Sequence, residues 1–344
     1  MRILNVQPVL ASYRVPFFEG LASDVDVSSL VVFSDHNSKF GSYAPSGCHV
    51  ELADWYSVKG LFFPRSLRKY CDLLGASTHV IHFADFKYST LWLGLVYAKL
   101  MGVRFFLHGQ GGYKGRQGIA KRIVYFFSVL MSDGYICYTE YSKKNLLRLL
   151  PKFLHGKVSV ARNSLYLDAC SVYDSSSLDV FYVGRLREGN GLNLVLEAAK
   201  LLGLVVHVIG EGDARQSLER EYTTAIFYGA VFDEAEQQVI ASKCMAGVYG
   251  GDAGLSVVHY MSLGLPVVVH SSIKDHMGPE PSYVIDGYNG LLFQRSSTDS
   301  LKSALFRLQA DSALRDRLSD GAQKTFVALS EPPMHKKFIQ IMGL

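Results

Sequence analysis

Five short apolar runs in the second half of the chain constrain its fold most strongly. They are rich in valine and tyrosine, and they read DVFYVGRL (179–186), VVHVIGEG (205–212), AIFYGAV (225–231), MAGVYGG (245–251) and LPVVVHS (265–271). Turn residues follow each run, and in most cases a helical pattern such as NLVLEAAKLLG or DEAEQQVIASKC comes next. Buried strands that alternate with helices are typical of a parallel sheet covered on both faces. This half therefore predicts a doubly wound α/β domain.

The first half repeats the pattern, which predicts a second domain of the same class. Its apolar runs are RILNVQPV, DVSSLVVFSD, HVIHFAD, RFFLHGQ and DGYICYTE, and 344 residues suit two domains. The Ser- and Asp-rich stretch near 165–178 lacks helical periodicity and marks the boundary. We predict an N-terminal domain over 1–165, a C-terminal domain over 166–325, and a last segment, 326–344, that packs back on the first domain.

The predicted architecture is α/β, with two Rossmann-like domains that face each other across a cleft. Two doubly wound domains in series bring the carboxyl ends of both sheets to this cleft, where ligands of such folds bind. Residues just after the strands are then the candidates for chemistry. His108 is one of them, because it ends the strand RFFLH and is followed by Gly109, Gln110, Gly111 and Gly112.

Composition favours a soluble cytoplasmic protein. Nearly half of the residues are hydrophobic, which is enough for two packed cores. The five cysteines are scattered without metal-ligand spacing, which is typical of thiols in a reducing cytosol. No apolar run approaches the ~20 residues that a membrane-spanning helix needs, and the opening residues read as a strand rather than a signal peptide.

The distribution of charge differs between the two halves. Residues 1–170 hold 20 Lys and Arg against 11 Asp and Glu, and the remainder holds 15 against 20. Three segments of the basic half, 59–70, 111–131 and 143–157, interleave cations with apolar side chains. Such segments predict peripheral contact with an anionic membrane surface, which we expect at the inner face of the cell membrane. No nucleic-acid-binding motif is present, so we predict no nucleic-acid partner.

Two motifs in the second half suit a phosphate ligand. In YGGDAGLSVVHYM a strand ends at small residues and a helix begins near Ser256, so backbone N–H groups and a helix N-terminus can face an anion. Arg185 follows another strand as a fixed cation able to bind phosphate oxygens. A third turn, VIGEGDAR, has Arg215 where the dinucleotide fingerprint ends in glycine, which disfavours a nicotinamide enzyme.

Six segments of the second half, taken in order, resemble the family 4 (group 1) glycosyltransferases of GT-B fold. They are VGRL, GLNLVLEA, VIGEG, FYG, GLSVVHYMSLGLPVV and DGYNGLLF. The resemblance covers about residues 178–295. In the first half PVLASYRVPFF, HGQG, CYTEYSKKNLL and VARNS look like the corresponding acceptor-side segments. Members of this family transfer a sugar from a nucleotide diphosphate sugar with retention of anomeric configuration, usually without a metal. The resemblance therefore implies no cofactor and no metal site.

The resemblance also implies roles at matching positions. Arg185 would neutralise the diphosphate, and His108 would lie beside the transferred sugar; these are the two predicted catalytic residues. The predicted donor-binding residues are Gly184, Asn190, Glu211, Asp252, Gly254, Leu255, Ser256, His259 and Glu280. The predicted acceptor-side residues are Tyr13, Arg14, Gln110, Gly111 and Glu140.

The chain departs from the family pattern at three positions. Asn190 occupies the place of a lysine that assists the arginine in many members, and Gly251 and His259 occupy the places of two glutamates. A neutral imidazole offers one donor and one acceptor, so it cannot accept hydrogen bonds from both ribose hydroxyls as a carboxylate can. We hypothesise that Glu280 reaches the nucleoside instead.

The function predicted from the sequence is a retaining glycosyltransferase. Its donor would be a nucleotide diphosphate sugar, and its acceptor a lipid-linked or oligosaccharide glycan in bacterial surface polysaccharide synthesis, of the O-antigen (lipopolysaccharide) or capsule type. Because no nucleophilic carboxylate is evident, attack on the same face as the leaving group is preferred. Two alternatives stay open: a nucleotide-sugar epimerase or hydrolase of the same fold, and a non-catalytic protein that binds sugar nucleotides.

Overall fold

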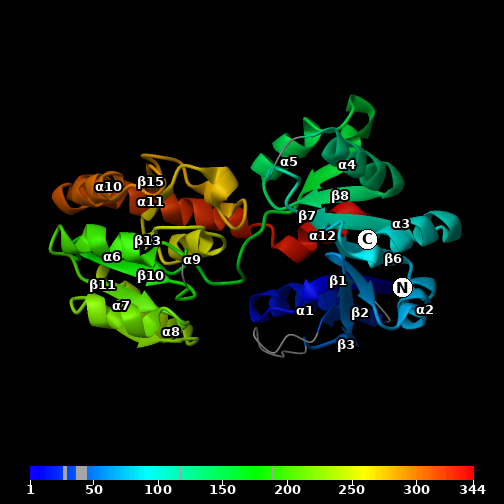
Figure 1. Ribbon diagram of the computed structural model, residues 1–344, viewed down its shortest axis with the longest axis horizontal. Helices are drawn as coiled ribbons and strands as arrows, with labels where there is room; N and C mark the ends of the chain where they lie inside the picture. Colours follow the sequence, from blue (N-terminus) through cyan, green and yellow to red (C-terminus); the bar gives the residue numbers. More distant parts are fainter. Residues whose placement is uncertain (26–28, 36–44, 116–117, 188) are drawn as a thin grey trace. The chain divides into compact units, whose positions relative to one another are not determined.

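The protein is described by a computed structural model that covers residues 1–25, 29–35, 45–115, 118–187 and 189–344. The chain forms two compact units (Figure 1). Unit 1 comprises Met1–Tyr166 and Pro332–Leu344, and unit 2 comprises Leu167–Glu331. Arg116, part of one predicted membrane-facing segment, lies outside the described residues. No described helix is long and apolar enough to span a membrane.

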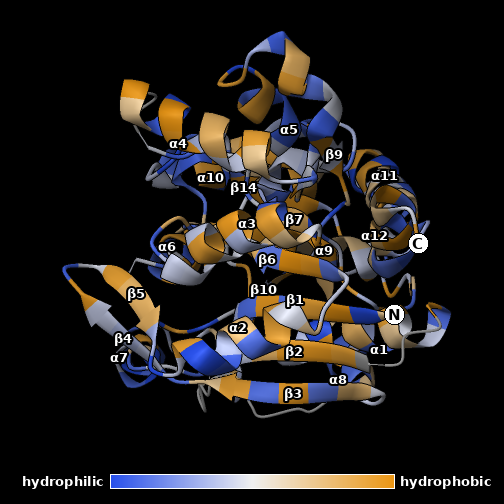
Figure 2. Ribbon diagram, turned by 90° about the vertical axis from the view of Figure 1, so that its right-hand side faces the viewer, coloured by the Kyte–Doolittle hydropathy of each residue, from blue (hydrophilic) through white to orange (hydrophobic). Residues whose placement is uncertain are grey.

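Unit 1 is built on a seven-stranded parallel sheet of order β3-β2-β1-β6-β7-β8-β9. The central strands are largely hydrophobic along their length because helices cover both faces, whereas the edge strand β3 is mixed (Figure 2). The strands are β1 (Arg2–Val9), β2 (Ser29–Asp35), β3 (Cys48–Ala53), β6 (His79–Phe83), β7 (Arg104–Gly109), β8 (Gly134–Cys137) and β9 (Val158–Val160). A separate antiparallel hairpin joins β4 (Trp55–Val58) and β5 (Leu61–Pro64).

Two hydrophobic cores lie on the two faces of this sheet. One contains Phe17, Phe18 and Leu21 of α1 (Val15–Asp24), together with Phe338 of α12 (Met334–Met342). The other lies under α2 (Leu67–Gly75), α3 (Ser89–Met101), α4 (Ile119–Met131) and α5 (Glu140–Leu147). Short 3-10 turns, η1 (Ser12–Arg14) and η3 (Lys152–Lys157), complete the unit.

Unit 2 contains a six-stranded parallel sheet of order β12-β11-β10-β13-β14-β15. Its strands are β10 (Asp179–Val183), β11 (Val206–Ile209), β12 (Ile226–Gly229), β13 (Cys244–Tyr249), β14 (Val267–His270) and β15 (Gly290–Phe293). Its helices are α6 (Leu192–Lys200), α7 (Arg215–Glu221), α8 (Glu234–Ala241), α9 (Ser256–Ser262), α10 (Thr298–Ala310) and α11 (Ser312–Ser330), with 3-10 turns η4 (Ile273–Asp275) and η5 (Glu280–Tyr283). The predicted doubly wound α/β class is confirmed for both units.

The last helix belongs to unit 1 although it follows unit 2 in the chain. Phe338 packs edge to face on Phe17 with ring centroids 5.0 Å apart, and Arg104 donates a hydrogen bond of 2.9 Å to the Met342 carbonyl. The predicted terminal segment begins at residue 326, which lies inside α11 because Phe326 and Leu329 are buried on that helix. The observed change of unit comes after Glu331.

Candidate functional site

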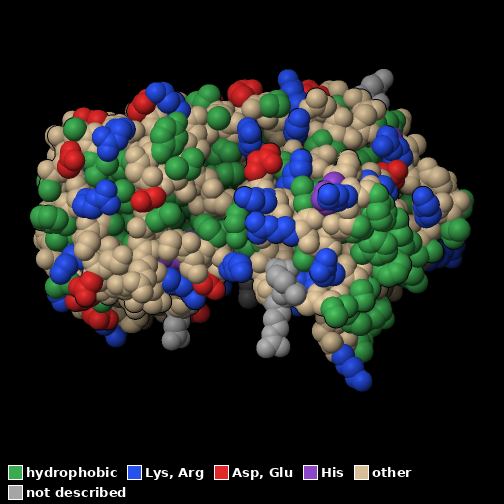
Figure 3. Space-filling view, turned by 90° about the horizontal axis from the view of Figure 1, so that it is seen from above, with side chains coloured by type: hydrophobic (Ala, Val, Ile, Leu, Met, Phe, Trp, Pro, Cys, Tyr) green, Lys and Arg blue, Asp and Glu red, His purple; other side chains and the backbone are tan. Residues whose placement is uncertain are grey.

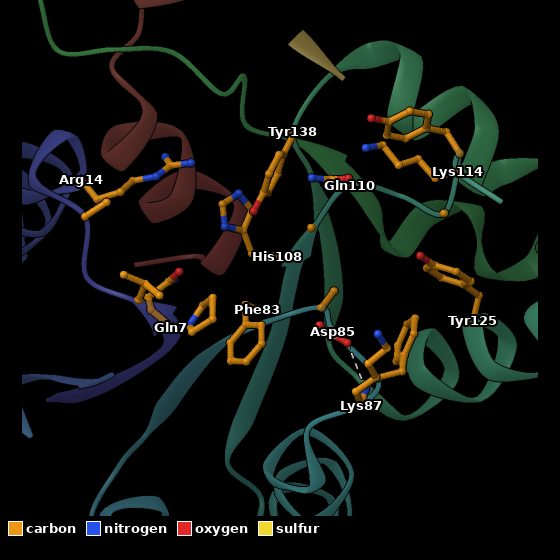
Figure 4. A pocket seen from close by; sticks show the side chains of 18 of the residues that line it. Gln7, Arg14, Phe83, Asp85, Lys87, His108, Gln110, Lys114, Tyr125 and Tyr138 are labelled. Carbon is orange, nitrogen blue, oxygen red and sulfur yellow. Dashed lines mark hydrogen bonds between the residues drawn. The ribbon is translucent and has the colours of Figure 1, made fainter. Parts of the chain in front are cut away.

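A pocket of about 650 Å³ opens in unit 1 at the carboxyl ends of β1, β6 and β7 (Figure 4). This is the edge of a parallel sheet where ligands of doubly wound folds bind. Of the predicted unit 1 site residues, Tyr13, Arg14, His108 and Gln110 line the pocket. Its other polar or charged lining residues include Gln7, Asp85, Lys87, Lys114, Lys121, Tyr125 and Tyr138.

His108 lies at the end of β7 with only 4% of its surface exposed. Its ring packs against Tyr138 and Phe338, with centroids 4.6 Å and 4.9 Å away. Burial, and secondarily the positive charge of Arg14, hold the pKa of this histidine well below its usual value, so the ring is neutral at pH 7. Nε2 is buried and has no hydrogen-bond partner among the described residues. An imidazole nitrogen without a partner in a pocket wall is available to a ligand hydroxyl.

Arg14 is fixed by residues distant in the sequence. Its guanidinium donates to Oδ1 of Asn163 and approaches Sδ of Met334 at 3.1 Å. The guanidinium also lies 5.3 Å from the ring centroid of Tyr13. Asn163 is only 3% exposed, so the asparagine of the VARNS motif positions the cation beside His108.

The glycines after His108 are required by close packing. Gly111 has φ +68°, and a Cβ there would lie 2.6 Å from the Ser142 carbonyl oxygen. Its N–H donates to the Tyr135 hydroxyl at 3.2 Å. Gly111 therefore shapes the loop that carries Gln110 into the pocket, without lining the pocket itself. The remaining acceptor-side prediction, Glu140, is exposed at the first position of α5 and does not line the pocket.

In unit 2, the turn after β13 leads into α9 and offers consecutive backbone donors. The N–H groups of Gly254, Leu255 and Ser256 donate no hydrogen bond within the part of the chain that the structure describes. Helix starts leave such groups free, and they suit an anion. Because α9 has only seven residues, the donors matter more than the helix dipole. Ser256 Oγ donates to the Val183 carbonyl at 3.4 Å, which ties the turn to the end of β10.

Two stacked histidines support this turn from behind. The rings of His270 and His276 lie 3.7 Å apart and nearly parallel, and both are fully buried. Nδ1 of His276 accepts from the Ala253 N–H at 3.2 Å, so its Nε2 carries the proton and donates to the His270 carbonyl at 2.9 Å. His276 therefore links the turn to the end of β14.

The glycines around the turn pack backbone against backbone. A Cβ on Gly251 would lie 2.5 Å from the Asn190 carbonyl carbon, and one on Gly191 would lie 2.3 Å from the Gly251 nitrogen. Both ends of the Asn190 amide are used for hydrogen bonds at this contact. The amide donates to the Arg185 carbonyl and accepts from Nε of Arg187 at 2.8 Å. Asn190 thus holds the loop after β10, and it is only 3% exposed.

The two predicted site residues of the VGRL motif, Gly184 and Arg185, have different surroundings. Gly184 continues the sheet by donating to the Ile209 carbonyl at 3.0 Å, and Arg185 is exposed. The VIGEG turn packs closely on this strand end: a Cβ on Gly210 would lie 1.9 Å from the Gly184 carbonyl oxygen. Glu211 pairs with Arg215, and its side chain is 51% exposed.

The remaining predicted donor-binding residues lie in different environments. His259 is partly buried on α9, and burial lowers its pKa to about 4, so it is neutral at pH 7. Glu280 is 2% exposed at the start of η5, with its carboxylate packed against Gly278. Asp252 faces Arg295, which lies 3.4 Å from it and 3.5 Å from Asp275.

Sequence reasoning missed several residues that shape these sites. Lys114 and Lys121 were placed in a membrane-facing segment, and the structure shows that they also line the pocket. Tyr125 lies in the same predicted segment and Tyr138 in the CYTEYSKKNLL run, but neither was predicted as a site residue, because aromatic residues next to strands and in helices are usually core. Among the described residues, no group of three or more His, Cys, Asp or Glu side chains could hold a metal ion.

Comparison with known proteins bears on the family and on the fold. Residues 172–325 match the family described as glycosyl transferases group 1. An uncharacterized glycosyltransferase of Methanocaldococcus jannaschii is 23% identical over 63% of this chain and 61% of its own length. The lipopolysaccharide core biosynthesis glycosyltransferase LpsE of Rhizobium meliloti is 24% identical over 48% of this chain. This chain thus spans 61% and 49% of the lengths of these two relatives.

Among solved structures, Anabaena HepE in complex with UDP is 14% identical to this chain. The TM-score is 0.75, and the match covers the whole of both chains. The family match covers most of unit 2, and the fold match extends over the full length of the chain. The chain has the GT-B fold, and its second unit matches the group 1 glycosyltransferases.

Proposed function

We propose that the protein is a retaining glycosyltransferase that uses a nucleotide diphosphate sugar as donor. The observation that carries the proposal is the row of three N–H donors at Gly254, Leu255 and Ser256, in a unit that matches the group 1 family. Anabaena HepE, which has a similar fold, was crystallised with UDP and with UDP-glucose, which makes uridine nucleotides the first donors to test.

Transition-state charge would fall on the leaving diphosphate. Fixed N–H donors and a cation stabilise such charge without reorganising during the reaction. The turn at 254–256 would supply the donors and Arg185 the cation, with no metal required. In unit 1, the neutral ring of His108 would bind a sugar hydroxyl through Nε2, beside the positive charge of Arg14. Asp85 is the one carboxylate among the described residues that line the pocket, and it accepts the Lys87 N–H at 3.0 Å. We therefore favour attack on the same face over a covalent intermediate.

The acceptor would be a glycan bound in the unit 1 pocket. Aromatic residues such as Tyr13, Tyr125 and Tyr138 in its lining suit the faces of sugar rings. The relative LpsE acts in lipopolysaccharide core biosynthesis. With the basic character of the first half, this supports a lipid-linked acceptor in bacterial surface polysaccharide synthesis, of the O-antigen or capsule type.

Turnover with and without acceptor tests this function against its alternatives. The protein is incubated with UDP-, GDP- and ADP-sugars, each with and without a polyprenyl diphosphate-linked sugar, and released nucleoside diphosphate is measured. Acceptor-dependent release that persists in EDTA is expected. Release without acceptor would indicate a hydrolase. Conversion of the sugar nucleotide into its epimer, detected by chromatography, would indicate an epimerase, and binding with neither release nor conversion a non-catalytic protein. Arg185→Ala should reduce the rate, while Arg220→Ala, a substitution on the outer helix α7, should not.

We also propose that the outer face of α3 and α4 contacts an anionic membrane at the inner side of the cell membrane. Four apolar residues form an exposed stripe along α4: Ile119 (78% exposed), Ile123 (49%), Phe127 (49%) and Leu130 (38%). Phe153 of η3 is 71% exposed next to this stripe, its ring 6.3 Å from that of Phe126. Residues 86–132 include seven Lys and Arg and no Asp or Glu. Hydrophobic side chains gather over this part of unit 1, with Lys and Arg around them (Figure 3).

Vesicle co-sedimentation tests the membrane face. Binding should require phosphatidylglycerol and weaken with salt, because the basic rim is attracted to anionic headgroups. The double variant Ile123→Glu/Phe127→Glu should lose binding. The matched control is Phe232→Glu, which alters an apolar side chain of unit 2 that is 90% exposed. Equal binding by both variants would contradict the assignment.

A further inference from the structure

The unit 1 pocket has two chemically different ends (Figure 4). Gln7, Arg14, His108 and Tyr138 gather at one end, and Lys87, Lys114 and Tyr125 lie at the other, with Asp85 beside Lys87. The proposed chemistry uses only the first end. The second end, which we call the lysine end, has no role in that chemistry.

The lysine end carries more positive than negative charge, since three lysines line it together with the carboxylate of Asp85. Lys121 also lines the pocket, and its ammonium donates to the backbone carbonyl of Lys114, so the two residues are held together. The Lys114 ammonium lies 5.8 Å from the centroid of the Tyr113 ring. Among the described residues, four cationic side chains and one carboxylate line the pocket, so its field favours an anionic ligand.

Helix α4 joins the lysine end to the apolar stripe on its outer side. Lys121 and Tyr125 are one turn apart and line the pocket, while Ile119, Ile123 and Phe127 are exposed. Positions 121 and 125 lie on the side of the helix opposite to 119, 123 and 127. A ligand group held by Lys121 is therefore about 10 Å, one helix diameter, from the proposed membrane face.

We propose that the acceptor carries a diphosphate group that Lys114 and Lys121 bind, and that a prenyl chain links it to the membrane. This inference rests on the proposed function and names its acceptor class. Lysine ammonium groups bind phosphate oxygens as point charges. The glycan on this diphosphate then extends along the pocket toward His108, with the aromatic lining beside its rings.

Isothermal titration calorimetry with farnesyl diphosphate tests the proposal, because it requires neither nucleotide nor turnover. Lys121→Ala should weaken binding at least tenfold, and Lys121→Arg, which keeps the charge, should bind like the wild type. The matched control is Arg122→Ala, which removes the exposed neighbouring cation outside the pocket lining. Lys114→Ala is a second loss variant, since Lys121→Ala also removes the bond to the Lys114 carbonyl.

Two further ligands show whether the pocket recognises the diphosphate group, the prenyl chain or both. Farnesol should not bind, and inorganic diphosphate should bind more weakly than farnesyl diphosphate. Inorganic diphosphate binding equally well, with the same dependence on Lys121, would assign the subsite to a phosphate-bearing glycan and overturn the lipid part. If Lys121→Ala bound farnesyl diphosphate with unchanged affinity, the whole proposal would be overturned. If Arg185→Ala lost the binding instead, the diphosphate would be placed in unit 2, and the proposal would be overturned as well. Lysine-dependent binding without any nucleotide-sugar turnover would refute the proposed function but keep the subsite.

Discussion

At the scale of single residues, the glycine at position 251 follows from packing. Its α-carbon faces the backbone of Gly189 and Asn190, so no side chain fits without moving that loop. Asn190 in turn uses both ends of its amide to hold the same loop. The two departures at 190 and 251 are therefore one coupled change. Packing between two backbone segments takes the place of the lysine and glutamate side chains found at these positions in many family members.

Gly251→Glu, which would restore the residue found in many family members, should destabilise this protein. Overpacking against backbone typically costs about 1–3 kcal/mol, and the displaced loop carries Arg185. Urea unfolding should show the loss, and calorimetry should show weaker UDP binding. Gly156→Ala is the control, because its added Cβ meets nothing within 4 Å. Tighter UDP binding at unchanged stability would show that the loop adapts freely.

Residue identity alone could not predict these roles. The sequence identified Asn190 and Gly251 as departures, but their coupling depends on two loops that meet only in the folded sheet. His108 and Arg14 were predicted to belong to the site, and the structure places both in one pocket. The Arg14 contacts with Asn163 and Met334 span 149 and 320 positions along the chain, beyond any local pattern.

At the scale of elements, the turn before α9 depends on His276. The imidazole accepts from Ala253 and donates to His270, so removing it releases the turn from β14. His276→Ala should raise the dissociation constant for UDP about tenfold, a change of about 1.4 kcal/mol. His276→Asn keeps an acceptor near the Nδ1 position and should restore part of the affinity.

Comparing the change in the donor KM with the change in kcat checks that role. A residue that only positions the diphosphate turn should change the donor KM more than kcat in both His276 variants. If His276→Ala lost stability and kept wild-type UDP affinity, His276 would be a core residue with no role in donor binding.

Sequence patterns predicted most of the central strands because these strands are buried on both faces. The run RILNVQPV coincides with β1, and AIFYGAV contains β12. The missed strands are β3, β9, β15 and the β4–β5 hairpin, which lie at sheet edges or outside the two main sheets. Most residues of β3 and of the hairpin are partly buried or exposed, and β9 and β15 are only three and four residues long, so hydrophobic runs do not reveal them.

At the scale of the whole molecule, buried histidines make stability depend on pH. Burial lowers the pKa of His82 in unit 1 and of His270 in unit 2 to about 4, against about 6.5 in the unfolded chain. The unfolded state then binds more protons below pH 6.5, so stability is complete above that pH and decreases toward pH 4. His82 alone should account for roughly 3 kcal/mol over this window.

Urea unfolding measured by tryptophan fluorescence checks this dependence, because Trp55 and Trp92 both lie in unit 1. His82→Gln should lower stability at neutral pH and flatten the decrease toward acid. A wild-type stability that stays constant between about pH 6.5 and 4.5 would contradict the prediction.

Truncating Phe338 should affect both the stability and the site of unit 1. The side chain is fully buried and packs on Phe17 and His108. Phe338→Ala should cost about 3–5 kcal/mol, the usual range for a buried phenylalanine. Phe338→Leu should retain more of the stability, and residual activity in each variant would report how far the His108 ring has moved. Wild-type stability in Phe338→Ala would mean that α12 does not complete this core.

The return of α12 to unit 1 has a consequence for biosynthesis. Unit 2 is a continuous segment, whereas unit 1 needs residues at both ends of the chain. A ribosome releases the N-terminal residues first, and domains generally fold as units when their chain is complete. Unit 2 can therefore fold while the nascent unit 1 still exposes the apolar surface around Phe17. Chaperones would meet that surface until Pro332–Leu344 have been translated.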